Sequence, residues 1–164
     1  MNLDNFDKKI LDLLSTNAKI SNAALAREIG LTPPATLERV RKLEKNGFIL
    51  GYKTVLDKNK LGKGLTCFVA LHLAHHNKQK VFQLVENSLK KYEEIEEIHL
   101  VTGRYDYLIK IHLKNVEELR EFIIEKLTKL GFISKVETFV AISSLNNANF
   151  NLVHNIQTSG VKIS

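Results

Sequence analysis

The sequence predicts an α+β protein in two parts, a winged helix-turn-helix domain followed by a ferredoxin-like βαββαβ domain. Two observations support this prediction. Up to residue 50, three stretches repeat apolar residues at helical spacing, and each begins at a capping residue. After residue 65, runs of β-branched and apolar residues alternate with two further helical stretches in the order βαββαβ.

The first two helices are short and bounded by capping residues. Asp4 precedes the first helix, which fades at Asn17 and has an apolar face made of Phe6, Ile10, Leu13 and Leu14. Ser21 is an N-cap for the second helix, residues 22–29, and Gly30 is placed to end it.

The third helix has an apolar face and a charged face. Thr32 precedes it, Pro33 takes the first helical position, where a missing N–H costs nothing, and Gly47 stops it. Thr36, Val40 and Leu43 share one face, and the opposite face holds Pro34, Glu38, Arg41, Lys42 and Lys45. A tight connection before such a helix is typical of a helix-turn-helix, whose last helix enters the major groove of DNA.

Seven residues of this region are therefore predicted to contact DNA: Thr32, Pro34, Glu38, Arg39, Arg41, Lys42 and Lys45. Residues 27–60 hold eight Lys or Arg and four Asp or Glu, so +4 of the net charge of +6 lies in this stretch. That concentration favours a nucleic-acid partner, and it also fits a solvated surface. The structural alternative is a plain three-helix bundle with a charged outer face.

Composition places the domain boundaries. Residues 1–50 are the DNA-binding domain, 51–64 a strand and linker, 65–145 the ferredoxin-like domain, and 146–164 an Asn-rich tail, mobile or in contact with another subunit. Residues 48–56 are expected to form an extended strand that leaves the helices, and residues 57–60 a polar linker.

The ferredoxin-like part is predicted to contain four strands: 65–73, about 98–100, 108–113 and about 135–143. Asn77 is expected to cap the first helix between these strands, and the acidic run Glu93–Glu97 follows the end of that helix. Asn115 caps the second helix, which Gly131 ends. The residues expected to face inward are Val81, Leu84, Val85, Leu89 and Tyr92, then Val116, Leu119, Ile123, Leu127 and Leu130.

Two helices cover only one face of such a sheet. The other face bears alternate residues of apolar strands, and a partner sheet from a second subunit is the simplest way to bury it. Symmetric helix-turn-helix proteins also need two copies, one helical turn of DNA apart. Both parts of the chain thus predict a homodimer.

Composition also indicates the cellular compartment of the protein. Cys67 is the single cysteine, so no intramolecular disulfide forms, and it is interpreted as a small buried hydrophobe. No segment approaches the ~20 apolar residues that cross a bilayer, and the acidic start is unlike a leader peptide. These features predict a soluble, cytoplasmic protein.

No catalytic or metal-binding pattern is visible. The six histidines form no HExxH spacing, and the pair His75-His76 is interpreted as part of a surface loop. A Gly-rich phosphate loop and a Ser/His/Asp pattern are also missing from the sequence. We therefore expect no enzymatic activity, no cofactor and no metal.

From about residue 3 to residue 145 the chain resembles the Lrp/AsnC family, the leucine-responsive and asparagine-responsive transcription regulators of bacteria and archaea. Two segments carry most of the resemblance, Arg-Val-Arg-Lys-Leu-Glu at 39–44 and Gly-Arg-Tyr-Asp-Tyr at 103–107. Either segment alone is weak evidence, but both at this separation are specific. The family often has Lys or Arg where this chain has Glu38, and commonly threonine where it has Val136.

The resemblance implies a DNA-binding transcription regulator that dimerises sheet to sheet, with dimers assembling to tetramers or octamers. It also implies an amino-acid effector bound between subunits, at Thr102, Gly103, Arg104, Tyr105, Asp106 and Thr138. A zwitterion needs an acceptor for its ammonium, as Asp106 offers, and donors for its carboxylate, as Arg104 or turn N–H groups offer. The alternative is a purely structural turn, in which Asp106 is a cap and Gly103 supplies the backbone angle.

The sequence is also compatible with two functions other than an effector-responsive regulator. Siroheme decarboxylases resemble the same family, and His72, His99, His112 and Arg104 are the residues that such an enzyme would use here. The basic third helix argues against that interpretation. The second rival is an architectural DNA-binding protein with no effector, which fits the valine at position 136.

Overall fold

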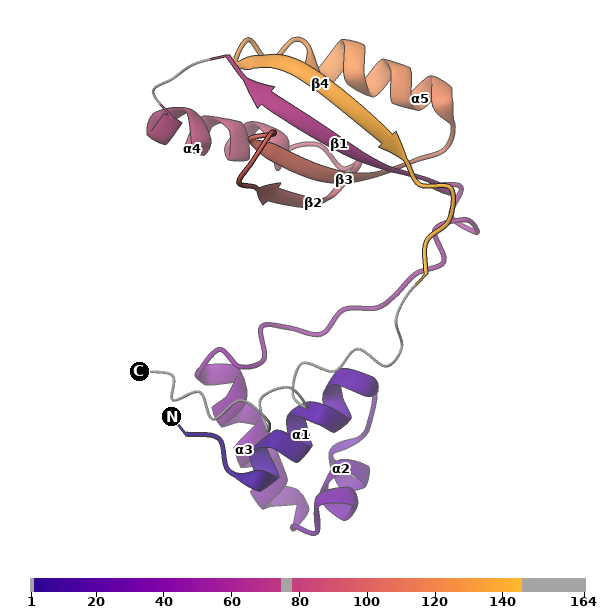
Figure 1. Cartoon of the computed structure of the whole chain (residues 1–164). Helices are drawn as coiled ribbons and strands as arrows, with labels where there is room; N and C mark the ends of the chain where they lie inside the picture. The colour runs from indigo at the N-terminus through magenta and orange to yellow at the C-terminus, as the bar shows by residue number, and fades with distance from the viewer. Residues whose placement is uncertain (1, 75–77, 146–164) are drawn as a thin grey trace. The chain divides into compact units, whose positions relative to one another are not determined.

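The structure, a computed structural model, describes residues 2–74 and 78–145 (Figure 1). They form two compact units that divide between Val55 and Leu56, within the predicted linker; we name them the helical unit and the sheet unit. The pair His75-His76, the cap Asn77 and the Asn-rich tail lie outside the described residues. None of the described helices is long and apolar enough to span a membrane.

The helical unit contains the three predicted helices: α1 (Asn5–Thr16), α2 (Asn22–Ile29) and α3 (Pro33–Lys45). Asp4 caps α1 in a capping box, with Asp7 as its reciprocal partner. Ser21 caps α2 by accepting from the Ala24 N–H at 3.2 Å. Gly30 ends α2 with φ +77°, a left-handed conformation that a side chain would disfavour.

A small apolar core holds the three helices together, formed by Ile10, Leu25, Ile29 and Leu43. Phe6, which was predicted to share the apolar face of α1 with Ile10, is 40% exposed and lies outside this core. Phe6 lies in the first turn of α1, where the Arg39 guanidinium covers its ring at 5.3 Å from the centroid. The apolar face of α1 therefore enters the core only from the second turn onward.

The strand predicted over residues 48–56 is absent. α3 ends in a tight C-terminal turn, in which Gly47 has φ +74° and the Phe48 N–H donates to the Leu43 carbonyl at 2.9 Å. The residues that follow, 49–57, have no regular secondary structure. An extended segment becomes a strand only when a neighbouring strand takes up its backbone hydrogen bonds, and the described part of this chain provides none there. Leu50 and Val55 are 94% and 85% exposed as a result.

The sheet unit has the predicted ferredoxin-like arrangement. Its antiparallel sheet has the order β2-β3-β1-β4, with β1 (Leu65–Leu73), β2 (Ile95–Leu100), β3 (Tyr107–Leu113) and β4 (Ile133–Val140). Two boundaries differ from the prediction. β2 begins within the acidic run, and β4 lies two to three residues earlier, because its first residue, Ile133, pairs with Leu73.

The two helices of the sheet unit are α4 (Lys78–Leu89) and α5 (Val116–Glu121), and α5 continues as the π-helix η1 (Phe122–Leu127) (Figure 1). Both pack on one face of the sheet. The core between them and the sheet contains Cys67, Val69, Leu71, Tyr107, Ile109 and Ile111 from the strands and Val85, Leu89, Leu119, Phe122 and Leu127 from the helices. Cys67 is fully buried as predicted, and burial raises the pKa of its thiol.

Two residues predicted to face this core are exposed instead. Leu84 is 54% exposed, and Phe82 packs against the core in its place. Val116 is 67% exposed. A π-helix bonds each residue to the fifth one along, so Phe122 and Leu127 share the buried face and the inward pattern differs from that of a regular helix.

The face of the sheet turned away from the helices, named here the open face, is only partly apolar. Directly paired residues of adjacent strands share a face, which places on the open face Phe68, Leu108 and Phe139 together with Glu97, Lys110, His112, Lys135 and Glu137. Phe68 and Phe139 are 36% and 48% exposed. The open face is therefore less apolar than alternate residues of apolar strands would suggest, because every strand contributes polar residues to it.

Candidate functional site

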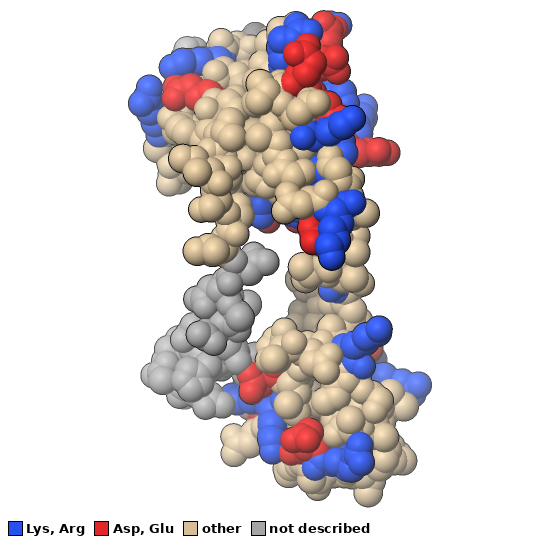
Figure 2. Space-filling view, turned by 90° about the vertical axis from the view of Figure 1, so that its right-hand side faces the viewer, with Lys and Arg blue, Asp and Glu red and all other residues tan. Residues whose placement is uncertain are grey.

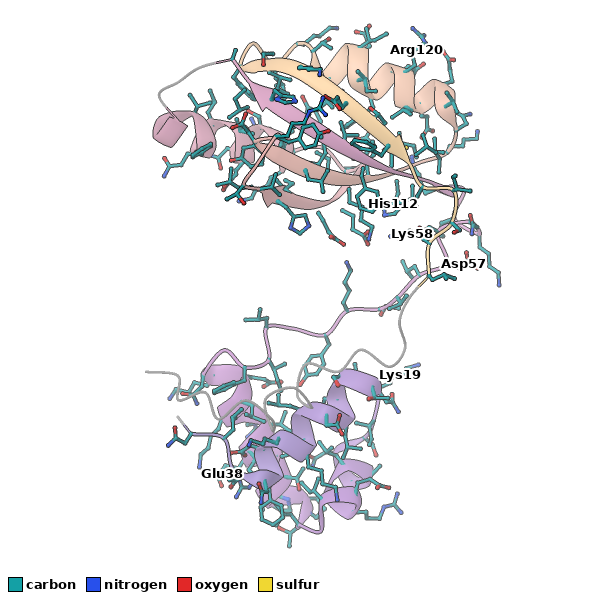
Figure 3. All side chains as sticks on the ribbon, in the orientation of Figure 1. Lys19, Glu38, Asp57, Lys58, His112 and Arg120 are labelled. Carbon is teal, nitrogen blue, oxygen red and sulfur yellow. The ribbon has the colours of Figure 1, made fainter. Side chains whose placement is uncertain are left out.

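The outer face of α3 is exposed, and it carries Pro34 together with charges of both signs on Glu38, Arg41, Lys42 and Lys45. Figure 3 labels Glu38 on the outside of the helical unit. The Lys42 ammonium lies 2.7 Å from the Glu38 carboxylate one turn earlier, and this bond lowers the pKa of Glu38. Both side chains are more than half exposed, at 58% and 68%, so solvent screens the pair and Lys42 stays available to other anions.

The connection between α2 and α3 is fixed by hydrogen bonds. The Leu31 N–H donates to the Ala26 carbonyl at 3.0 Å across the left-handed Gly30. The Asn22 side-chain amide donates to the Pro33 carbonyl at 2.8 Å. These contacts hold the two helices at a fixed angle to each other.

Arg39 is the one member of the predicted DNA-contacting set that is not exposed. Its guanidinium donates to the carboxylates of Asp4 at 2.7 Å and Asp7 at 2.8 Å. The structure thus brings Arg39 to the start of α1, away from the outer face of α3. Its partners lie 35 and 32 residues earlier in the chain, a separation that helical spacing does not reveal.

The loop between β2 and β3 is anchored to β1 by its aspartate. One Asp106 carboxylate oxygen accepts from the Leu73 N–H at 2.9 Å, and the Asp106 N–H donates to the Leu71 carbonyl at 3.0 Å. Gly103 has φ +117°, in the region that favours glycine. These contacts give Asp106 and Gly103 the structural roles that the turn interpretation expects, whatever else the loop binds.

Two other residues of the loop reach across to β4. The Tyr105 hydroxyl donates to the Glu137 carboxylate at 2.9 Å, and Arg104 donates to it at 3.4 Å. Lys135 bonds to the same carboxylate at 2.6 Å. Lys135 first and then Tyr105 lower the pKa of Glu137 to about 2, so this carboxylate is ionised at neutral pH. His72 completes the group, with its ring centroid 5.1 Å from that of Tyr105.

Thr138 is not part of this group. It pairs directly with Val69, which is fully buried on the helix-covered face, whereas the neighbouring Glu137 pairs with Ala70 and lies on the open face. The sheet therefore separates the Thr138 side chain from the contacts of Arg104 and Tyr105. Val136 also packs against the helix-side core. Lys135 and Glu137 were not predicted as members of this group, although the period-two alternation of β4 is a signal that separates Glu137 from Thr138.

Two family models match the chain. Residues 3–49 match the winged helix-turn-helix DNA-binding model, and residues 66–149 match the Lrp/AsnC ligand binding domain. The leucine-responsive regulatory proteins of Klebsiella pneumoniae and Escherichia coli (strain K12) are each 36% identical over 147 residues, which is 90% of this chain and 89% of the relative. The chain belongs to the Lrp/AsnC family.

Solved structures agree with the Lrp/AsnC fold. The structure of Escherichia coli AsnC superimposes with a TM-score of 0.79 at 27% identity, covering 88% of this chain and 95% of that one. A transcriptional regulator from Neisseria meningitidis, solved as an L-Met complex, has a TM-score of 0.87 at 21% identity and covers 94% of this chain and 99% of its own. This Lrp/AsnC protein is thus a transcription regulator with a DNA-binding part and a ligand-binding part.

A second ion cluster of this Lrp/AsnC protein lies on the open face near the linker. One Glu96 carboxylate oxygen lies 2.7 Å from the His112 ring, 2.8 Å from Lys58 and 3.0 Å from Lys110. Figure 3 shows Lys58 from the linker beside His112 from the sheet. The bond from Lys58 is the largest cause of a pKa for Glu96 well below its usual range. This cluster could not be predicted from local sequence patterns, because its members come from three separate segments.

The histidines of the enzyme alternative do not converge on one site. His72 lies beside Tyr105 and Glu137, His99 bonds to Glu97 at 3.0 Å, and His112 belongs to the Glu96 cluster. Within residues 2–74 and 78–145, no group of three or more His, Cys, Asp or Glu side chains is placed to hold a metal ion.

Figure 2 shows Lys and Arg interleaved with Asp and Glu on the visible face of both units.

Proposed function

We propose that this Lrp/AsnC regulator reads duplex DNA with the outer face of α3 and senses an amino acid at the loop of residues 102–106. The observation that carries the DNA part is the exposure of Arg41, Lys42 and Lys45 on one helix that directly follows a hydrogen-bonded turn. Cations on such a helix neutralise phosphates and set its register along the duplex.

Glu38 gives the DNA-reading face its own specificity. A carboxylate facing phosphates is repelled, so its presence on this face is productive only where it meets a base edge. In the major groove a carboxylate accepts from the N4 amino group of cytosine. Glu38 is ionised beside Lys42, and the Lys42 ammonium can transfer to a phosphate when the pair opens. We therefore propose that the operator has a cytosine opposite Glu38 in each half-site.

The loop has the groups that an amino acid requires. Arg104 is 70% exposed and its bond to Glu137 is long, at 3.4 Å, so its guanidinium can turn to a ligand carboxylate. Asp106 supplies the anion for the ligand ammonium, while its bond to the Leu73 N–H holds it in place. The names of the leucine-responsive relatives support an aliphatic amino acid as the first candidate.

Replacing Asp106 with Asn separates the ligand role from the turn role. An amide oxygen still accepts from the Leu73 N–H, so the parent melting temperature should be nearly retained, but the anion is lost. A ligand at a hundredfold excess over its Kd stabilises a protein by about 2.7 kcal/mol, and most of that gain should disappear in Asp106→Asn.

The measurement is a melting-temperature screen of the parent and Asp106→Asn against each of the twenty common amino acids. Glu93→Gln is the matched control, since it removes an exposed carboxylate elsewhere in the sheet unit. A parent shift that survives in Asp106→Asn would rule out Asp106 as the ammonium acceptor. No parent shift with any amino acid would leave the architectural role as the better proposal.

We also propose that the regulator acts in the cytoplasm as a homodimer, with the open face of one sheet against that of a second copy. Phe68 and Phe139 supply the exposed apolar area, and ionic groups flank them. Light scattering of the purified chain tests this assembly and also reports tetramers and octamers. A monomer at micromolar concentration would contradict the proposed dimer.

A further inference from the structure

Arg39 completes a hydrogen-bond network in which every carboxylate oxygen of Asp4 and Asp7 accepts a hydrogen bond. Asp4 Oδ1 accepts from the Asp7 N–H at 2.8 Å, and Asp7 Oδ2 accepts from the Asp4 N–H at 3.2 Å. The two remaining oxygens, Asp4 Oδ2 and Asp7 Oδ1, both accept from Arg39 Nη1. We name these three residues the α1–α3 clamp.

The clamp is tightly coupled to the fold of the helical unit. The Asp7 side chain is only 4% exposed, so removal of its cation would leave an almost buried charge without compensation. The backbone bonds of the capping box hold both carboxylates in position beside Arg39. The Phe6 ring lies under the guanidinium and shields it further from water.

We propose that Arg39 is a positioning residue, which fixes the recognition helix α3 against the start of α1 and makes no contact with DNA. This inference rests on the proposal that the outer face of α3 reads DNA. A phosphate would compete for Arg39 against two carboxylates that are already in place. The clamp carries a net charge of about −1, from two acids and one base, and thus repels a phosphate as a unit.

The substitution Asp7→Asn tests whether Arg39 binds a phosphate or positions α3, because the two roles predict opposite changes in DNA affinity. If Arg39 bound a phosphate, Asp7→Asn would release the guanidinium and strengthen DNA binding. If Arg39 positions α3 through Asp7, the same substitution loosens the helix and weakens binding. The positioning role predicts a loss of about tenfold in affinity for an operator-like duplex, the factor that corresponds to about 1.4 kcal/mol.

The probes are a short duplex enriched by the parent protein from a random-sequence pool and an unrelated duplex of equal length. Asp7→Asn and Arg39→Gln should each lower affinity for the enriched duplex about tenfold and leave that for the unrelated duplex nearly unchanged. The salt slope should stay at the parent value, whereas loss of a phosphate contact would lower it by about 0.9. The double variant should be no weaker than either single one, since both break the same network.

Glu28→Gln is the matched control, because Glu28 is an exposed acid of the helical unit outside the clamp. It should bind both duplexes at least as well as the parent. Circular dichroism at the assay temperature confirms that each variant is folded, and Arg39→Lys should recover part of the affinity by bonding to one carboxylate. Tighter binding by Asp7→Asn, or a flatter salt slope in Arg39→Gln, would overturn the inference. If the Arg41 and Lys42 variants also kept the parent slope, the proposed DNA-reading face itself would be at fault.

Discussion

Replacing Arg41 and Lys42 together with alanine should lower the affinity for duplex DNA by about 10- to 100-fold at 0.1 M salt. Each phosphate contact adds about 0.9 to the slope of log K against log salt, so the slope should fall by about 2. Both side chains are exposed on the outer face of α3 and lie outside the folded cores, so the melting temperature should change little.

Fluorescence anisotropy of a labelled duplex over a series of salt concentrations measures this slope. Lys90→Ala with Lys91→Ala is the matched control, because it removes the same charge from exposed positions on the sheet unit. The control should keep the parent slope. Equal losses of DNA affinity in the two double variants would show that only net charge matters. An unchanged salt slope in the variant with Arg41→Ala and Lys42→Ala would contradict the proposal that α3 contacts DNA.

Lys42 also makes this prediction informative about Glu38. In the free protein the two side chains form a bond at 2.7 Å, which opens if Lys42 moves to a phosphate. The parent must therefore break this bond before Lys42 can reach a phosphate, a cost that Arg41 does not have. The single variant Lys42→Ala should lose less affinity than Arg41→Ala, although each removes one positive charge.

Local signals predicted most of the fold correctly. Capping residues such as Ser21 and Asn115, and glycines such as Gly30, act on their immediate neighbours, so the sequence marks where helices begin and end. β1 was predicted with both boundaries correct, because its apolar run is bounded by polar segments on both sides. The strand over 48–56 failed because strands need a partner, and no local pattern supplies that information.

The candidate sites were harder to predict because they join distant segments. Arg39 shares the helical repeat of the basic residues on α3, but Asp4 and Asp7 hold it from another helix. Thr138 and Glu137 are adjacent in the chain, yet strand alternation sends their side chains to opposite faces. Residue type thus selected the candidate residues of the loop and of α3, while their partners and orientation required the three-dimensional structure.

Replacing Glu96 with Gln should have a large effect on the stability of the sheet unit. The Glu96 carboxylate is the common partner of Lys58, Lys110 and His112, and its side chain is only 20% exposed. Gln keeps the shape but leaves the basic groups close together without their anion. Hydrogen bonds to a charged group contribute about 1.5–3 kcal/mol, so the free energy of unfolding should fall by about 2–3 kcal/mol at neutral pH.

The pH dependence of this loss has a definite sign. The folded-state pKa of Glu96 lies below its ordinary value of 4.5, so its contribution is complete above that pH and declines as pH falls further. The difference in stability between the parent and Glu96→Gln should thus be constant near neutral pH and shrink below about pH 4.5. A difference that grew in acid would contradict the assignment of Glu96 as the ionised centre.

Urea unfolding followed by tyrosine fluorescence measures this difference. The chain has no tryptophan, and three of its four tyrosines, Tyr92, Tyr105 and Tyr107, lie in the sheet unit. Glu97→Gln is the matched control, since Glu97 bonds to the same Lys110 at 3.1 Å but is 43% exposed. Solvent screens that pair, so the control should lose less than about 1 kcal/mol. Equal losses at the two positions would mean that net charge on β2, and not convergence on Glu96, stabilises the sheet.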